Sequence, residues 1–116
     1  MVESSRVAVI HSDHEVFISA LELQEKIQLT FLSKEDAREL VRVCAPMDFG
    51  PSGRTYDQSD RYHFGDYDSE DKRHTLSLLP DQILEIRAAG ESFAPGDFIT
   101  WSPIRWFYPR DWGQYS

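Results

Sequence analysis

A change of hydrophobic period near residue 25 constrains the fold of this chain more than any other feature. Between Val16 and Leu21, apolar side chains recur at spacings of three and four, the period of one face of a helix. Over residues 27–31 they alternate with polar side chains instead, the period of a half-buried strand. The sequence therefore predicts a short helix over residues 13–24 that leads directly into a strand.

The start of this helix carries a capping signal. Ser12 and Glu15 stand at the spacing of a capping box, in which each side chain bonds the backbone amide of the other residue. The apolar run at residues 7–10 comes before it and is too short for a helix. This run forms either an edge strand or an extended arm packed on the core, and an exposed edge would offer a route to a homodimer.

Four later segments show strand patterns bounded by turn-forming residues: 40–44, 62–67, 76–78 and 83–86. Pro46 is expected to end the first of these strands, because proline has no amide donor. Residues 49–60 form a polar loop rich in Gly, Pro and Ser. Short strands joined mostly by short turns favour an antiparallel sheet, since a doubly wound sheet needs helices between its strands.

These elements predict a mainly β, α+β fold. It has one N-terminal helix and a strongly bent, five-stranded antiparallel sheet that closes into a small barrel over residues 12–95. Residues 96–116 form an aromatic C-terminal extension, which Pro103 and Pro109 keep irregular. We interpret its aromatic side chains as cover for one end of the barrel. The alternative is an exposed patch in which Trp106 and Tyr108 bind a protein partner.

Length and charge narrow the function classes. The 116 residues fit one domain, 1–116. A net charge of −8 argues against a nucleic-acid partner, because affinity for phosphates comes from Lys and Arg. The single cysteine, Cys44, lies in an apolar strand segment and is expected to be an inert core thiol. With no signal-like segment and no apolar stretch of about 20 residues, we expect a cytoplasmic protein without membrane contact.

No catalytic or metal-binding pattern stands out in the sequence. Asp66, Asp68 and Glu70 alternate like the start of a calcium loop, but such a loop needs Gly and Glu where this chain has Asp71 and Ser77. Hydrolase, phosphate-loop and zinc motifs are absent from the sequence. We therefore predict no catalytic residues, no metal site, no cofactor and a function other than catalysis.

The order of these elements resembles the WYL domain of bacterial regulators over residues 17–95. The segments that carry the resemblance are 20–31, 41–46, 61–68, 73–78 and 83–93. It implies a small Sm-like β-barrel that senses a ligand or nucleic acid through a polar, basic surface. The Trp-Tyr-Leu tripeptide that names the family is matched here only by Tyr62, His63 and Phe64, and the family's arginines are mostly missing. The contacts that carry over to a small anionic ligand are Tyr62, His63 and Arg73.

The resemblance and the charge together leave three candidate functions. The first is a non-catalytic regulatory or ligand-sensing module. The second is an acidic protein-interaction module, in which Asp66, Asp68 and Asp71 of the acidic segment 57–71 dock on a basic surface. The third is a weak nucleic-acid binder whose few cations are Arg61, Arg73, Arg105 and Arg110.

Overall fold

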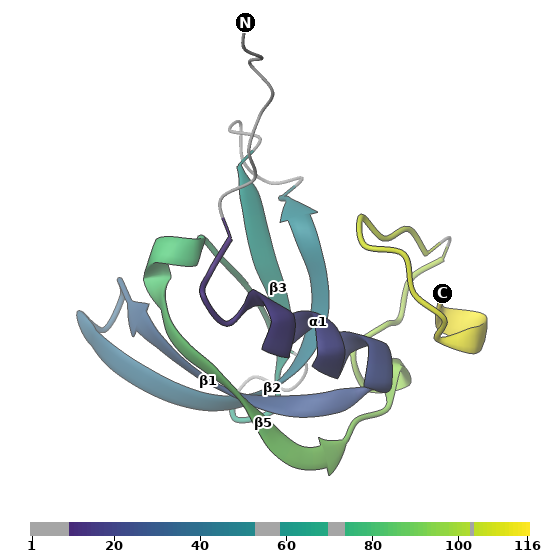
Figure 1. The fold of residues 1–116 in the computed structure, drawn as a ribbon, viewed down its shortest axis with the longest axis horizontal. Coiled ribbons are helices and arrows are strands. Elements are labelled where there is room, and N and C mark those ends of the chain that lie inside the picture. The colour runs from purple at the N-terminus through teal and green to yellow at the C-terminus, as the bar shows by residue number, and fades with distance from the viewer. Residues whose placement is uncertain (1–9, 53–58, 70–73, 103) are drawn as a thin grey trace, which may run out of the picture.

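The computed structural model of the chain describes residues 10–52, 59–69, 74–102 and 104–116, and shows a mostly β, α+β fold (Figure 1). Its helix is α1 (His14–Leu23), and its strands are β1 (Glu25–Ser33), β2 (Arg38–Pro51), β3 (Asp60–Asp66), β4 (His74–Leu78) and β5 (Ile83–Ser92). Short 3-10 turns follow at Pro80–Gln82, Pro95–Asp97 and Gly113–Tyr115. The helix and the five antiparallel strands are those that the sequence predicts. The strand predicted over 83–86 extends to Ser92.

The helix forms as predicted, but its predicted capping box is wrong. Asp13 takes the N-cap position, and the cap makes no side-chain hydrogen bond to the helix. The Asp13 carboxylate accepts the backbone N–H of Ile86 at 3.0 Å instead. This carboxylate oxygen therefore joins the start of α1 to β5 and does not cap the backbone amides of the first helical turn.

β2 is longer than the sequence predicts, and Pro46 does not end it. The strand pairs with β1 as far as Cys44 and with β3 from Cys44 onward. A register shift lies between Pro46 and Asp48, just after β2 has left β1. Proline is tolerated at such a place. β2 no longer pairs with β1 there, and the bulge interrupts its regular pairing with β3, so the missing amide donor of Pro46 breaks no regular hydrogen-bond ladder.

The sheet is strongly bent but does not close into the predicted barrel. The strand order is β4-β3-β2-β1-β5, so β4 and β5 are the two edges among the described strands. After β4, the turn at Pro80–Gln82 leads the chain to the far edge, where β5 pairs with β1. Closure would need β4 and β5 to pair with each other, and they do not.

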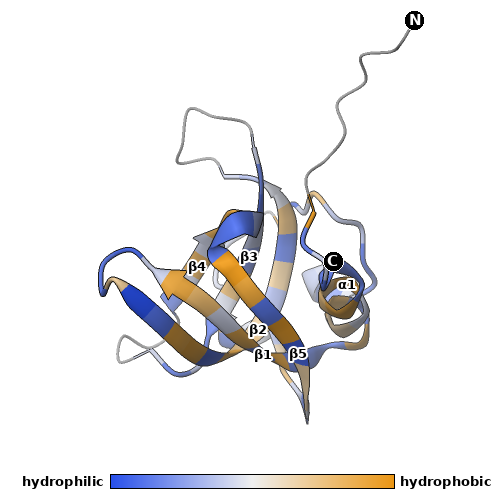
Figure 2. Ribbon diagram, turned by 60° about the vertical axis from the view of Figure 1, so that its left-hand side comes forward, coloured by the Kyte–Doolittle hydropathy of each residue, from blue (hydrophilic) through white to orange (hydrophobic). Residues whose placement is uncertain are grey.

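α1 fills one end of the concave side of the sheet. Phe17 and Leu21 of α1 are fully buried, and the Phe17 ring makes edge contacts with Tyr62 and Phe64 of β3. Figure 2 shows α1 beside the curved sheet, and apolar and polar bands alternating along β5. The helix covers only part of the concave side, and the rest of that side forms the cavity described below.

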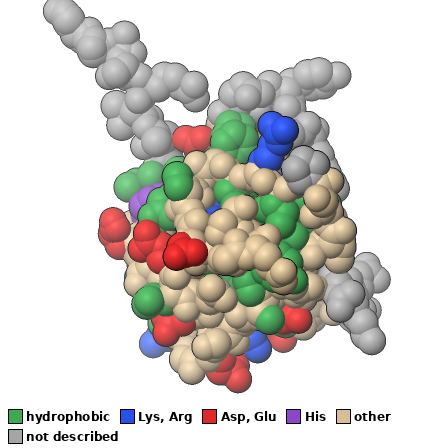
Figure 3. Space-filling view, turned by 90° about the vertical axis from the view of Figure 1, so that its right-hand side faces the viewer, with side chains coloured by type: hydrophobic (Ala, Val, Ile, Leu, Met, Phe, Trp, Pro, Cys, Tyr) green, Lys and Arg blue, Asp and Glu red, His purple; other side chains and the backbone are tan. Residues whose placement is uncertain are grey.

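On the opposite, outer face of the sheet, residues 93–116, which we call the C-terminal strap, cover part of β2 and β3. A side chain at Gly65 would meet the Phe98 ring at 2.6 Å, and one at Gly50 would meet Phe107 at 2.5 Å. The two glycines thus make room for two aromatic side chains. Phe98 and Trp112 are buried, as core cover predicts, whereas 63% of the Phe107 surface remains exposed. Figure 3 faces the strap, with hydrophobic side chains spread among polar ones.

A buried ion pair holds the strap to β2. Asp48 accepts the backbone N–H groups of Phe107 at 3.0 Å and Tyr108 at 2.9 Å, and pairs with Arg110 at 3.1 Å. The Arg110 side chain has no exposed surface. Its guanidinium lies 3.8 Å from the Trp106 ring centre and 4.4 Å from that of Trp112. Burial lowers the pKa of Arg110 to about 10 against the opposing effect of Asp48, so the arginine stays charged at neutral pH.

We expect Asp48→Ala to lower the free energy of unfolding by about 3–5 kcal/mol, because it leaves the Arg110 cation buried without its partner. Urea denaturation measures this loss. Glu85→Ala is the control, since it breaks an exposed pair with Arg87 and should cost about 1 kcal/mol or less. Equal unfolding midpoints for the two variants would contradict the anchoring role of Asp48.

We expect Gly65→Ala to cost about 1–3 kcal/mol of stability, because the new methyl group must displace the buried Phe98 ring. A double-mutant cycle with Phe98→Leu tests the cause. If the contact is responsible, Gly65→Ala costs less in the Leu background. The same cost in both backgrounds would show that the collision with Phe98 is not the reason.

Candidate binding groove

The uncovered end of the concave side is a groove of about 620 Å³. It lies between the ends of β1 and β3, the start of β2, and β4. Four of its five apolar lining residues have side chains that face the inside of the bend: Phe31, Leu40, Leu76 and Leu78. Cross-strand pairing of Phe31 with Leu40, and of Phe64 with Leu76, places these residues on the same side of the sheet as the core. The groove is therefore a continuation of the core that opens to solvent.

Charged residues form one wall of this groove. Arg42 donates to the backbone carbonyl of Asp68 at 2.8 Å, and its Nη1 atom lies 3.8 Å from Oδ2 of Asp66. The second distance is that of an ion pair and is too long for a hydrogen bond. Asp66 is buried with 3% of its surface exposed, and its other oxygen accepts the Asp68 N–H at 2.9 Å. Asp68 in turn accepts the N–H of Val43 at 2.7 Å. Each charged group is thus positioned by another or by the backbone.

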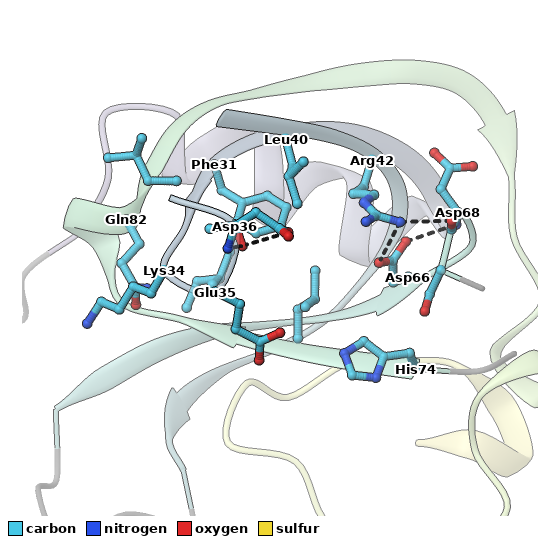
Figure 4. A pocket seen from close by; sticks show the side chains of 15 residues that line it. Phe31, Lys34, Glu35, Asp36, Leu40, Arg42, Asp66, Asp68, His74 and Gln82 are labelled. Atoms are coloured by element: carbon cyan, nitrogen blue, oxygen red, sulfur yellow. Dashed lines mark hydrogen bonds and ion pairs between the residues drawn. The ribbon is translucent and has the colours of Figure 1, made fainter. Parts of the chain in front are cut away.

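The two ends of the groove differ. Figure 4 shows Arg42, Asp66 and Asp68 gathered at one end, Lys34 and Gln82 at the other, and Leu40 between them. The described lining holds four carboxylates, from Glu35, Asp36, Asp66 and Asp68, against two cations, from Lys34 and Arg42. A mixed lining, in which an apolar wall stands beside an excess of carboxylates, suits a ligand that has an apolar part and a positive charge.

A smaller cavity of about 210 Å³ lies on the outer face, between the strap and the edge of the sheet. The strap contributes Trp101, Trp106 and Arg105, and β4 contributes Thr75 and Ser77. Trp101 is 45% exposed, so the cavity has an accessible aromatic wall. Only the strands β3 and β4 separate this cavity from the groove.

Two of the three predicted ligand contacts, Tyr62 and His63, lie away from the groove. Tyr62 is fully buried, and its hydroxyl accepts the N–H of His11 at 2.9 Å. His63 faces the outer cavity, where its Nε2 lies 2.9 Å from the Gly50 carbonyl oxygen and its Nδ1 lies 2.8 Å from the Ser77 hydroxyl. Arg73 lies outside the described residues.

The residues predicted to bind a partner are divided between the two faces. Asp66 and Asp68 line the groove, whereas Trp106 and Tyr108 belong to the strap. Trp106 stacks on Arg110, and the Tyr108 hydroxyl donates to Glu22 at 2.7 Å. Asp71 lies outside the described residues, as do residues 7–9 of the apolar arm.

Sequence reasoning missed Arg42 as a site residue. Leu40, Arg42 and Cys44 stand two positions apart, so strand alternation alone puts the arginine on the buried side. A charged residue at such a position is a signal of a functional or paired site. Cys44 is fully buried as expected, and its pKa is raised by burial and by the carboxylates of Asp66 and Asp68, which agrees with an inert thiol.

No family model, curated protein or solved structure matched this chain. The resemblance to the WYL domain therefore stays a prediction. Within the described residues, no group of three or more His, Cys, Asp and Glu side chains is placed to hold a metal ion. No helix in the same residues is long and apolar enough to span a bilayer.

Two histidines join the start of α1 to the sheet. The Nδ1 atom of His14 lies 2.7 Å from the Tyr62 hydroxyl, and its ring makes an edge contact with Phe49. His11 reaches the carbonyl of Ile83 at 2.9 Å through Nε2, and its Nδ1 accepts the N–H of Asp13. Burial lowers the pKa of His14 below its ordinary value of 6.5, against a smaller opposing effect of Glu15.

We expect stability to fall on acidification because the folded state favours the neutral form of His14. The contribution is fully present above the unfolded-state pKa near 6.5 and is lost as the pH drops through the lowered folded-state pKa. Urea midpoints at about pH 7 and about pH 5 should differ less in His14→Gln than in the parent chain. His74→Gln, at an exposed position, should keep the parent's pH dependence. An unchanged slope in His14→Gln would contradict this assignment.

Proposed function

We propose that this protein is a non-catalytic binding module that holds a cationic ligand with an apolar body in the groove. The observation that carries the proposal is the combination of an apolar part of the lining with a buried carboxylate, Asp66, on the groove wall. Desolvated carboxylates attract a cation more strongly than exposed ones, since the local dielectric is low. The lining also contacts the apolar part of a ligand, which adds affinity through burial.

The charge balance favours a cation over the small anion that the WYL resemblance implies. Arg42 is the arginine in the described lining. Its guanidinium already donates a hydrogen bond to the Asp68 carbonyl and forms an ion pair with the Asp66 carboxylate. An anion would have to compete with both partners and approach four carboxylates. A regulatory or ligand-sensing role for the module belongs to the same proposal.

An acidic protein-interaction module is the second candidate. Asp66 and Asp68, predicted to dock on a basic surface, lie in the groove beside Glu35 and Asp36. In this case the cation is a Lys or Arg side chain of the partner. The two candidates share the chemistry of the site and differ in the size of the ligand.

Phenethylamine and phenylacetate test the proposal, because they share a ring and differ in the sign of their charge. We expect phenethylamine to shift the methyl signals of Leu40, Leu76 and Leu78 in NMR titrations at low salt. Phenylacetate should leave these signals unchanged at the same concentration. Stronger binding of the anion, or no shift with either compound, would overturn the proposal.

Two variants test whether phenethylamine binds in the groove. Asp68→Asn removes one groove carboxylate and should weaken phenethylamine binding by about threefold to tenfold. Glu85→Gln makes the same change of charge on the exposed surface of β5 and should leave binding unchanged. Equal weakening in both variants would indicate a general charge effect and would count against the groove.

A further inference from the structure

The two edges of the sheet are treated differently by the rest of the chain. On β5, the Ile86 N–H is taken by Asp13 at 3.0 Å and the Ile83 carbonyl lies 2.9 Å from His11. The residues before α1 thus occupy backbone groups of that edge. At the other end of the sheet, β4 has β3 on one side and no described strand on the other. Exposed strand edges are commonly covered or blocked in natural proteins, so an uncovered one suggests a partner.

β4 also lies between the two cavities. His74, Leu76 and Leu78 line the groove, whereas Thr75 and Ser77 line the outer cavity. This division follows from strand alternation. A strand added beside β4 would follow the same alternation and would direct successive side chains toward the groove and toward the outer cavity. Such an arrangement supplies affinity through backbone hydrogen bonds and selectivity through the two sets of side chains.

The chemistry of the two cavities describes the segment that would fit. The groove has an excess of carboxylates, which favours basic side chains on the inward positions. The outer cavity offers Trp101, 45% exposed, and the half-buried Trp106, which favour apolar side chains on the outward positions. The segment is therefore extended, with basic and apolar residues in alternation.

We propose that β4 is a docking edge for an extended segment of a partner protein, which adds a strand to the sheet and places basic side chains in the groove. The inward half of this proposal rests on the binding of a cation in the groove proposed above, and the strand pairing is independent of it. A ring of copies paired through β4 and β5 is disfavoured, because His11 and Asp13 occupy backbone groups on the outer edge of β5. A symmetric pair of β4 edges would bring two acidic grooves together.

A short peptide of alternating valine and arginine with blocked ends is the probe. We expect it to bind the full chain and to slow hydrogen exchange of the backbone amides in β4 (His74–Leu78), while those in β5 (Ile83–Ser92) keep their rates. The same peptide with every internal amide N-methylated keeps its charge but cannot donate to a strand. We expect its affinity to be at least about tenfold lower.

A second control replaces each arginine of the peptide by glutamate and should also bind at least about tenfold more weakly. Equal binding of the methylated peptide, or unchanged β4 exchange, would overturn strand addition while leaving phenethylamine binding in the groove intact. Slowed β4 exchange without a preference for arginine over glutamate would overturn the basic partner. A dimer with protected β4 amides in the absence of peptide, seen by sedimentation, would show that a second copy occupies the edge and would also overturn the proposal.

Discussion

The buried pair of Asp48 and Arg110 is the interaction on which the outer side of the molecule depends. Asp48 follows the bulge in β2, and its carboxylate collects two strap amides as well as the guanidinium. Removing both charges from water is costly unless they are paired and hydrogen-bonded, and here Trp106 and Trp112 also stack on the cation. With the strap held in this way, part of the outer face of β2 and β3 is covered, and a cavity beside Trp101 stays accessible between the strap and the edge of the sheet.

The concave side holds a second ion pair with different properties. Arg42 and Asp66 are 3.8 Å apart, compared with 3.1 Å for Arg110 and Asp48, and the Arg42 side chain is 28% exposed. The first pair is therefore sealed within packed aromatics, whereas the second forms part of a cavity wall. A looser pair at a cavity wall can exchange partners with a ligand at lower cost than a sealed one, because solvent and ligand reach the same atoms.

The periodic parts of the fold were predictable from the sequence, and the contacts between distant segments were not. The helix, the five strands and their antiparallel sense follow from local alternation, which also hides Tyr62 and Phe64 in the core. The family motif nevertheless predicts Tyr62 as a ligand contact, although its position in the alternation indicates burial. Neither Asp48 nor Arg110 stands out locally, since their pairing joins residues 62 positions apart. Arg42 did carry a local signal, an inward position between Leu40 and Cys44.

Two expectations that failed, the capping box and the closed barrel, have one physical cause. The chain before α1 uses the Asp13 carboxylate and the His11 ring on backbone groups of Ile86 and Ile83 in β5. That use takes Asp13 away from the first turn of the helix. It also occupies the edge that β4 would have to pair with to close the sheet. On the other edge, β4 has no described strand on its outer side, and this strand lies between the groove and the outer cavity.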